Sequence, residues 1–187
     1  MQKIKGVIYM TELMKIMQQR HSCRKFLDKK VEDEKIVACI HAASLAPSAC
    51  NTQPYHFYVC NTPETVATAA EFSKFERVNS WVGSAGAFVI ITQEHAEIPS
   101  FIGSNTSGRD FRQYDIGLAI ENFLLEATEQ GLGTCILGCF NEEKLKEKFR
   151  IPSPKKIALL IAIGYPDEKE VPVKKRRALE ETITYLK

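Results

Sequence analysis

Hydrophobic and polar positions along the chain follow local patterns that predict five helices. The pattern is clearest at residues 115–130, where Asp115 lies in the first turn and Gly131 ends the helix. One face of this helix carries Ile116, Ala119, Ile120, Phe123, Leu124 and Ala127. Leu118 and Leu125 make its other side partly apolar, so we expect it to be central, or to pack against a second subunit as well as its own sheet. The other predicted helices span residues 11–18, 32–45, 63–73 and 141–149.

Two of these helices carry further local signals. In the helix at 32–45, Val37, Ile40 and Ala43 or Ser44 repeat at helical spacing, which predicts a buried face. The helix at 63–73 follows a Thr-Pro pair, a typical helix start. The helix at 141–149 is rich in charged residues and is predicted to lie on the surface.

Short apolar runs predict the strands, which lie at residues 56–60, 87–92, 134–137 and 156–164. Residues 93–113 lack any such period and are rich in Pro, Gly, Ser and Asn. They are predicted to form a long loop, which in a compact domain is a lid, a specificity element or a disordered segment. No internal repeat or low-complexity segment interrupts the chain.

Length and composition indicate one folded domain. The chain has 187 residues, of which 44% are hydrophobic and 26% charged, and this balance disfavours wholesale disorder, a collagen-like repeat or a coiled-coil rod. Met10 begins a second plausible start, so we expect a single domain at residues 10–187 and a short N-terminal extension at residues 1–9.

The charge balance and the distribution of apolar residues argue against two kinds of partner, nucleic acid and membrane. With 25 Lys and Arg against 23 Asp and Glu, the formal charge is +2, too small for a surface that binds nucleic acid. No stretch approaches the roughly 20 apolar residues of a membrane span, and the first ten residues lack the features of a secretory signal. We expect a cytoplasmic protein that binds neither nucleic acid nor membrane.

The cysteine spacing argues against a metal centre. The six cysteines form no CxxC, CxxH or other paired ligand set, so no metal site is expected. Cys39 and Cys60 are interpreted as small buried hydrophobic residues in a reduced compartment.

Four polar stretches are candidates for chemistry. The RHSCR sequence at residues 20–24 offers two guanidinium groups, an imidazole and a hydroxyl, donors that suit a phosphate, although such a run is also typical of a solvated surface. The loop at residues 46–55 places amides and hydroxyls between prolines; it either contacts the edge of a heterocycle or is an ordinary connection from helix to strand.

The other two stretches lie in the second half of the chain. GLGT at residues 131–134 precedes a strand, whereas a dinucleotide fingerprint follows one, so the usual Rossmann interpretation is excluded. Gly138, after the strand, can let backbone N–H groups approach a ligand closely. Residues 174–177, KKRR, are either a basic tail, a nonspecific nucleic-acid patch or a partner for phosphate.

Taken together and in this order, the stretches resemble the nitroreductase family of FMN-dependent oxidoreductases. The resemblance extends from about residue 20 to residue 181, and the APSxxNxQP loop and the GLGT segment are its most specific parts. The sequences that carry it are RHSCRKF, APSACNTQPYHFYV, DIGLAIENFLLEATEQGLGTCILGCF, IPSPKKIALLIAIGYP and KKRRALEE.

The resemblance implies an α+β fold: a nitroreductase-like sandwich with a central, mostly antiparallel sheet flanked by helices. It also implies a homodimer with FMN at the interface, contacted by both chains. NADH or NADPH would be the reductant, and a nitroaromatic, a quinone or a similar small electron-poor molecule the acceptor, with hydride passing through flavin N5 in alternate steps. Other flavin chemistry on the same scaffold, such as reductive dehalogenation or flavin fragmentation, and a flavin-binding protein with little turnover remain alternatives. So does a thiol enzyme that uses Cys50 or Cys139.

The same resemblance assigns the cofactor contacts by residue. Arg20, His21, Ser22 and Arg24 would hold the FMN phosphate, the ribityl chain and the N1/O2 edge of the ring. Pro47, Ser48 and Asn51 would come from the other subunit, and Leu137, Gly138 and Cys139 would line the ring near N5 through backbone groups. Lys174 and Arg176 would return to the phosphate, with Lys175 and Arg177 as candidates if the register differs by one.

The chain departs from the family pattern in places. Cys139 replaces a second glycine, which would narrow the space over the ring, and Ala49 replaces a second serine. Asn79 matches a family asparagine at the pyrimidine edge only across an alignment gap. The chain is short, so residues 98–112 are the only candidate lid.

Overall fold

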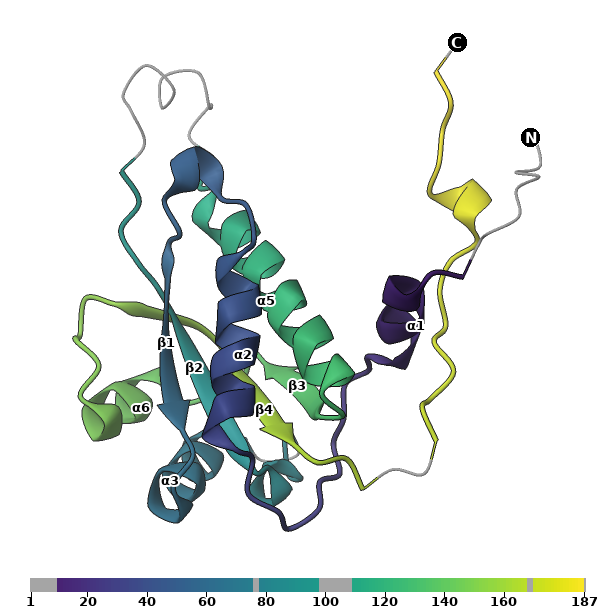
Figure 1. Ribbon diagram of the computed structural model, residues 1–187. Helices are drawn as coiled ribbons and strands as arrows, with labels where there is room; N and C mark the ends of the chain where they lie inside the picture. The colour runs from purple at the N-terminus through teal and green to yellow at the C-terminus, as the bar shows by residue number, and fades with distance from the viewer. Residues whose placement is uncertain (1–9, 76–77, 98–108, 168–169, 187) are drawn as a thin grey trace.

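The fold is a sandwich in which one sheet separates two layers of helices (Figure 1). The computed structural model describes residues 10–75, 78–97, 109–167 and 170–186. The extension expected at residues 1–9 and most of the candidate lid, residues 98–108, lie outside the described residues.

The central sheet has four strands in the order β1-β2-β4-β3. Every neighbouring pair is antiparallel, which confirms the α+β expectation. The strands lie where the apolar runs predict them, within one residue at either end. Their bounds are Tyr55–Cys60 for β1, Ala87–Gln93 for β2, Gly133–Leu137 for β3 and Lys156–Gly164 for β4.

Two long helices, α2 (Asp33–Ser44) and α5 (Arg112–Glu129), cover one face of the sheet. The apolar face predicted for α5 is confirmed, since all six of its residues are buried. Gly131 ends the helix in a left-handed conformation, with φ at +74°, as predicted. Leu118 is 49% exposed and Leu125 half-buried, so the second side of α5 is left partly uncovered.

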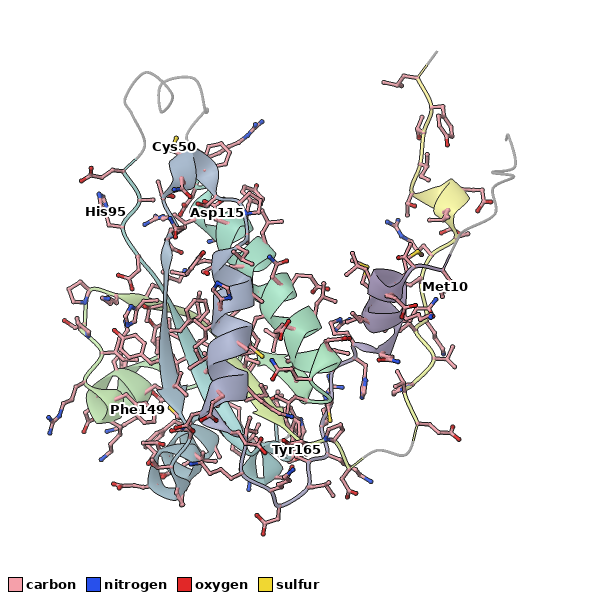
Figure 2. The ribbon with its side chains drawn as sticks, in the orientation of Figure 1. Met10, Cys50, His95, Asp115, Phe149 and Tyr165 are labelled. Carbon is pink, nitrogen blue, oxygen red and sulfur yellow. The ribbon has the colours of Figure 1, made fainter. Side chains whose placement is uncertain are left out.

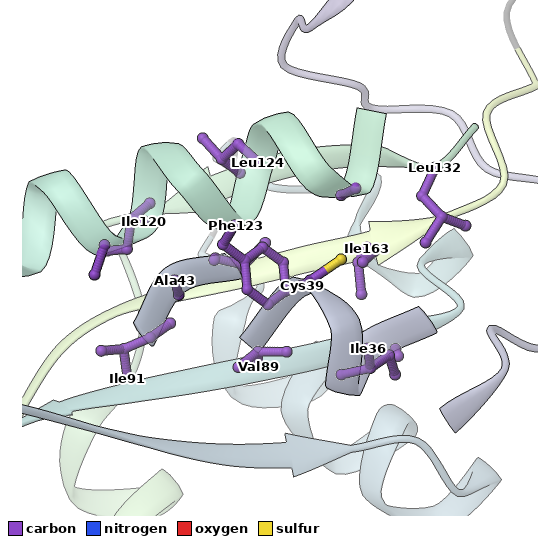
Figure 3. Packing of buried hydrophobic residues seen from close by; sticks show 14 of the residues in the cluster. Ile36, Cys39, Ala43, Val89, Ile91, Ile120, Phe123, Leu124, Leu132 and Ile163 are labelled. Carbon is purple, nitrogen blue, oxygen red and sulfur yellow. The ribbon is translucent and has the colours of Figure 1, made fainter. Parts of the chain in front are cut away.

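The face predicted for α2 is partly wrong. Ile36, Cys39 and Ala43 are buried, and Ile40 is half-buried, but Val37 is 63% exposed. Helical spacing fits two apolar stripes about 100° apart, and packing against the sheet and α5 selects the stripe that contains Ile36. Figure 3 shows Ile36 and Cys39 in the same buried cluster as Phe123 of α5 and Val89 of β2.

The second face is covered by α3 (Pro63–Ser73) and α6 (Glu142–Phe149). The predicted start of α3 is confirmed: Thr62 and Thr65 form a capping box around Pro63. Leu145 is the only buried residue of α6, which confirms a charged surface helix. Residues on this side of the strands, such as Phe88 and Leu160, form a core separate from the one under α2 and α5.

The two ends of the described chain lie away from the sandwich. Helix α1 (Glu12–Gln19) buries none of its residues and contacts α5. The tail, residues 170–186, passes beside α1 and continues past it (Figure 1). The ammonium group of Lys174 donates a hydrogen bond to the carbonyl oxygen of Met17, which joins the two segments. The short 3-10 helices span Ala49–Asn51, Val82–Ser84 and Leu179–Glu181.

Candidate functional site

The segment of residues 20–24 is fixed along the free edge of β3. Ser22 forms a parallel bridge with Thr134, and the amide of Cys23 donates to the carbonyl oxygen of Thr134 at 2.9 Å. A side chain on Gly133 would place its Cβ 2.8 Å from the sulfur of Cys23. Gly133 of the GLGT sequence therefore allows β3 to pack closely against Cys23. This packing places Arg20 and Arg24 beside the start of β3.

A basic cluster, defined as Arg20, Lys174 and Arg176, forms where this segment meets the tail. The side chain of Arg20 is 20% exposed, and its guanidinium lies 3.9 Å from the carboxylate of Glu121 on α5. Burial lowers the pKa of Lys174, and the positive charges of Arg20 and Arg176 lower it further, while Glu121 raises it. Three cations facing one acid leave a positive site that an anion would stabilise. Lys174 is half-buried, whereas Arg176 is exposed, as are the alternatives in register, Lys175 and Arg177.

The remaining residues of the first stretch lie close to the basic cluster in sequence and close to β3 in space. His21 donates through Nδ1 to the carbonyl oxygen of Gln19 at 3.0 Å. Arg24 donates to the carbonyl oxygen of Ser22 at 3.3 Å. Burial raises the pKa of the Cys135 thiol of β3, and Arg24 and Ser22 lower it, so both side chains lie beside this strand.

The exit of β3, residues 137–139, is open on its outer side. Leu137 is buried, but Gly138 and Cys139 are exposed, and a Cβ on Gly138 would meet nothing within 4 Å. The side-chain amide of Asn79 donates to the carbonyl oxygens of Ser73 at 3.1 Å and Cys139 at 3.2 Å. In this chain Asn79 therefore anchors the β3 exit, where the sequence suggested a contact to a ring edge.

The polar turn, residues 47–53, connects the end of α2 to β1. Its backbone is left-handed at Cys50, Asn51 and Gln53, with φ of 52°, 55° and 45°. The amide of Gln53 donates to Oγ of Ser48 at 3.0 Å, and its side chain donates to the carbonyl oxygen of Asn51 at 3.1 Å. Pro47 and Asn51 are exposed, and Ser48 is half-buried.

The polar turn and the basic cluster lie apart within one chain. In Figure 2, Cys50 marks the turn at the upper end of α2, while α1 and Met10 lie on the other side of α5. Pro47, Ser48 and Asn51 are thus not brought to Arg20 by the fold of a single chain. A site that uses both groups needs a second copy, as the resemblance implies.

Asp115 supports the polar turn, although the sequence alone identifies it only as an acid in the first turn of a helix. Asp115 is 5% exposed, and both of its carboxylate oxygens lie 3.2 Å from the amide nitrogen of Ala49 in the polar turn. A lone Asp in the first turn of a helix usually interacts with the helix dipole at the surface, so the sequence carries no signal for this contact.

The burial predicted for Cys39 and Cys60 is confirmed. Cys39 and Cys60 are buried, and burial raises the pKa of each thiol to about 12, which makes both unreactive at neutral pH. Cys50 and Cys139 are exposed free thiols, in the polar turn and at the β3 exit. Among the described residues, no group of three or more His, Cys, Asp or Glu side chains could hold a metal ion. Within the same residues, none of the helices has the length and apolar character needed to cross a bilayer.

The residues that the structure brings together suit a flat, anionic cofactor such as FMN. The basic cluster offers charge for a phosphate, and the open space at Gly138 lets the backbone of the β3 exit approach a ring. The amides and hydroxyl of the polar turn are exposed or half-buried, where a neighbouring chain could use them.

Comparisons with known proteins agree on one group. The model of the nitroreductase family matches residues 17–165. A relative from Archaeoglobus fulgidus, provisionally named as an NADH dehydrogenase/NAD(P)H nitroreductase, is 31% identical over 86% of this chain and 90% of its own length. The oxygen-insensitive NADPH nitroreductase of Helicobacter acinonychis is 28% identical, over 91% of this chain and 95% of its own.

Solved structures share the fold. A nitroreductase family protein from Streptococcus pneumoniae superimposes with a TM-score of 0.77 at 24% identity, and the match covers 94% of this chain and all of the other.

Proposed function

Since the chain belongs to the nitroreductase family, we propose that it is an FMN-dependent NAD(P)H oxidoreductase that reduces nitroaromatic, quinone or similar small electron-poor acceptors. The observation that carries the proposal is the basic cluster. Arg20 lies more than 150 residues from Lys174 and Arg176 in sequence. Glu121 offsets the mutual repulsion of the three cations only in part, which favours binding of a further anion. When bound, FMN supplies the hydride acceptor and donor at N5, so that reductant and acceptor react in turn.

The basic cluster would hold the phosphate of FMN. Two guanidinium groups and an ammonium group complement the nearly two negative charges of a phosphate monoester. Glu121 helps to orient Arg20, because their charged groups are 3.9 Å apart. Desolvation of Lys174 strengthens its attraction to an anion.

Residues beside β3 would hold the polar edge and the reacting edge of the ring. Arg24, with Ser22 and His21, would place a cation and hydrogen-bond donors near N1 and O2, where negative charge gathers on reduction. The backbone of Leu137, Gly138 and Cys139 would face N5, since Gly138 leaves that space open. Asn79 occupies the carbonyl oxygen of Cys139 and so fixes the direction of the following peptide.

A second copy of the chain would complete the site with Pro47, Ser48 and Asn51. The proposed dimer would also cover apolar surface that one chain leaves open on α1, α2, α5 and the tail. The exposed residues concerned are Leu13, Met17, Val37, Leu118, Val173 and Leu186. Val173 and Leu186 are 93% and 94% exposed, so the tail gains most from a partner.

The test is the spectrum of the purified native protein, followed by anaerobic titration. We expect a yellow homodimer whose flavin absorbance bleaches with NADH or NADPH and returns on addition of a quinone or nitroarene. The preferred nucleotide is the one that bleaches faster. Bleaching without turnover of any acceptor would favour a flavin-binding protein of low activity, and a colourless protein that FMN cannot reconstitute would contradict the proposal. Full activity after alkylation of Cys50 and Cys139 would remove the thiol alternative.

A further inference from the structure

The side chain of Asp115 is buried and contacts a part of the chain 66 residues away. It lies in the first turn of α5 and is 5% exposed, and its two carboxylate oxygens share the amide N–H of Ala49 at 3.2 Å each. Burying a carboxylate is unfavourable unless hydrogen bonds or charges compensate. The contact is therefore specific: the buried carboxyl group of Asp115 on α5 holds one peptide of the polar turn, the one before Ala49.

The polar turn needs such a support. Cys50, Asn51 and Gln53 have non-glycine side chains in the left-handed region, a conformation that persists only where the surroundings enforce it. Within the turn, the Gln53 amide is bonded to Ser48 and the Gln53 side chain to Asn51. These bonds close the turn on itself but do not fix it to the body of the protein. The bond from Ala49 to Asp115 does, because α5 is packed into the core.

The floor of the turn is polar beyond Asp115. The hydroxyl groups of Tyr55 and Thr52 are buried without a hydrogen-bond partner in the described part of the chain. Burial raises the pKa of Tyr55, and the negative charge of Asp115 raises it further, which places the two side chains near each other.

We propose that Asp115 is a positioning residue: by fixing the Ala49 peptide it sets the direction in which Ser48 and Asn51 reach into the cofactor site of the partner subunit. The inference rests on the proposed function. Asp115 itself is too deeply buried to touch the cofactor. Asp115 therefore affects the flavin that is bound by Arg20 of the partner subunit. It does not affect the flavin bound by the Arg20 of its own chain.

The first measurement is amide hydrogen exchange at Ala49 in the full-length protein, which needs no flavin. Asp115→Ala removes both acceptor oxygens and should speed exchange at Ala49 by about tenfold or more, while amides in the middle of α5 keep their protection. Asp115→Asn keeps one acceptor oxygen and should give a smaller increase. Glu129→Ala, which removes an exposed acid at the far end of the same helix, should change nothing at Ala49.

The second measurement is FMN content after subunit mixing. Asp115→Ala and Arg20→Ala homodimers should each retain little FMN. In a heterodimer isolated through two different tags, one site combines the intact Arg20 of the first chain with the intact turn of the second, so one of its two sites should fill. A defect in the fold of the Asp115→Ala chain, or a role of Asp115 in its own site, would leave both sites empty.

The outcomes separate the two proposals. Unchanged exchange at Ala49, or an FMN-free heterodimer built from two folded chains, overturns the positioning role. Where Asp115→Ala fails to fold, Asp115→Asn is used in both measurements, and wild-type exchange and wild-type FMN affinity in that variant overturn it as well. A wild-type protein that binds no FMN refutes the proposed function instead, and the exchange measurement still decides whether Asp115 anchors the turn.

Discussion

The side-chain amide of Asn79 and the carbonyl oxygen of Cys139, 60 residues apart, are joined by a hydrogen bond of 3.2 Å. Asn79 has φ at 61°, a backbone conformation that asparagine tolerates better than most residues, and its amide also reaches the carbonyl oxygen of Ser73. The bond ties the end of α3 to the exit of β3. Asn79 therefore helps to set the backbone position of Cys139, next to Gly138.

Asn79→Gly should weaken this tie without straining the backbone. Glycine accepts the left-handed conformation but removes both hydrogen bonds, which should cost about 1 to 3 kcal/mol of unfolding free energy, measured in urea. If the β3 exit faces the flavin, the rate of flavin reduction should fall as well. Ser84→Ala, which removes an exposed side-chain bond to Trp81 on the same side of the protein, is the control. Equal effects of the two variants on the reduction rate would contradict the role of Asn79.

Arg20→Ala should weaken FMN retention by about 2 kcal/mol or more, since a desolvated charge pair with the phosphate would be lost. The measurement is the dissociation constant of FMN by fluorescence titration. Lys144→Ala removes a cation of comparable size from an exposed pair with Glu147 on α6 and should leave the constant unchanged. Wild-type FMN content in the Arg20 variant would count against the basic cluster as the phosphate site.

The periodic parts of the chain could be predicted because local sequence determines them. The buried face of α5 and the four strands follow directly from the spacing of apolar residues. The exposure of Val37 could not, because two stripes of α2 fit a helical period and only the neighbouring layer selects between them.

The candidate site shows the same division. Its basic and amide-bearing stretches are visible in the sequence as departures from periodicity. The partners of Asp115 and Asn79 are 66 and 60 residues away, and such contacts arise from tertiary packing, which has no period in the sequence. Gly133 illustrates a third case: its motif contributes to the family resemblance, and the structure shows that Cys23 fills the space beside it.

FMN affinity should fall at alkaline pH because of Lys174. Burial, and then the charges of Arg20 and Arg176, lower its pKa below the usual lysine value of 10.5 in the flavin-free protein, and a bound phosphate would raise it again. The protonated form therefore binds more tightly, and affinity should be lost as the pH rises through the lowered pKa. Titrations of FMN across the alkaline range test this, and Lys174→Arg should flatten the profile, because arginine stays charged. A Lys174→Arg profile identical to that of the wild type would show that another group titrates.

Gly133→Ala should destabilise the fold. The new Cβ would lie 2.8 Å from both the Cβ and the sulfur of Cys23, and such overpacking costs about 1 to 3 kcal/mol. Cys23→Ala removes the sulfur but not the Cβ, so the double variant should recover part of the loss. Strictly additive changes in the midpoint of urea unfolding would mean that the two residues do not compete for the same space.

Gly138→Ala, unlike Gly133→Ala, should leave the stability of the fold unchanged and weaken FMN binding. A Cβ at this position meets nothing within 4 Å in the single chain. Its φ is not in the left-handed region, so a methyl group brings no backbone strain, and the unfolding free energy should stay within about 0.5 kcal/mol of the wild type. If the open space is where the flavin ring lies, the methyl group blocks the close approach of the backbone, and FMN should bind about tenfold more weakly. Calorimetry without FMN and titration with FMN measure the two effects on one sample. Tight FMN binding by a stable Gly138→Ala protein would place the ring elsewhere, whereas a loss of both stability and binding would mean that Gly138 serves packing, as Gly133 does.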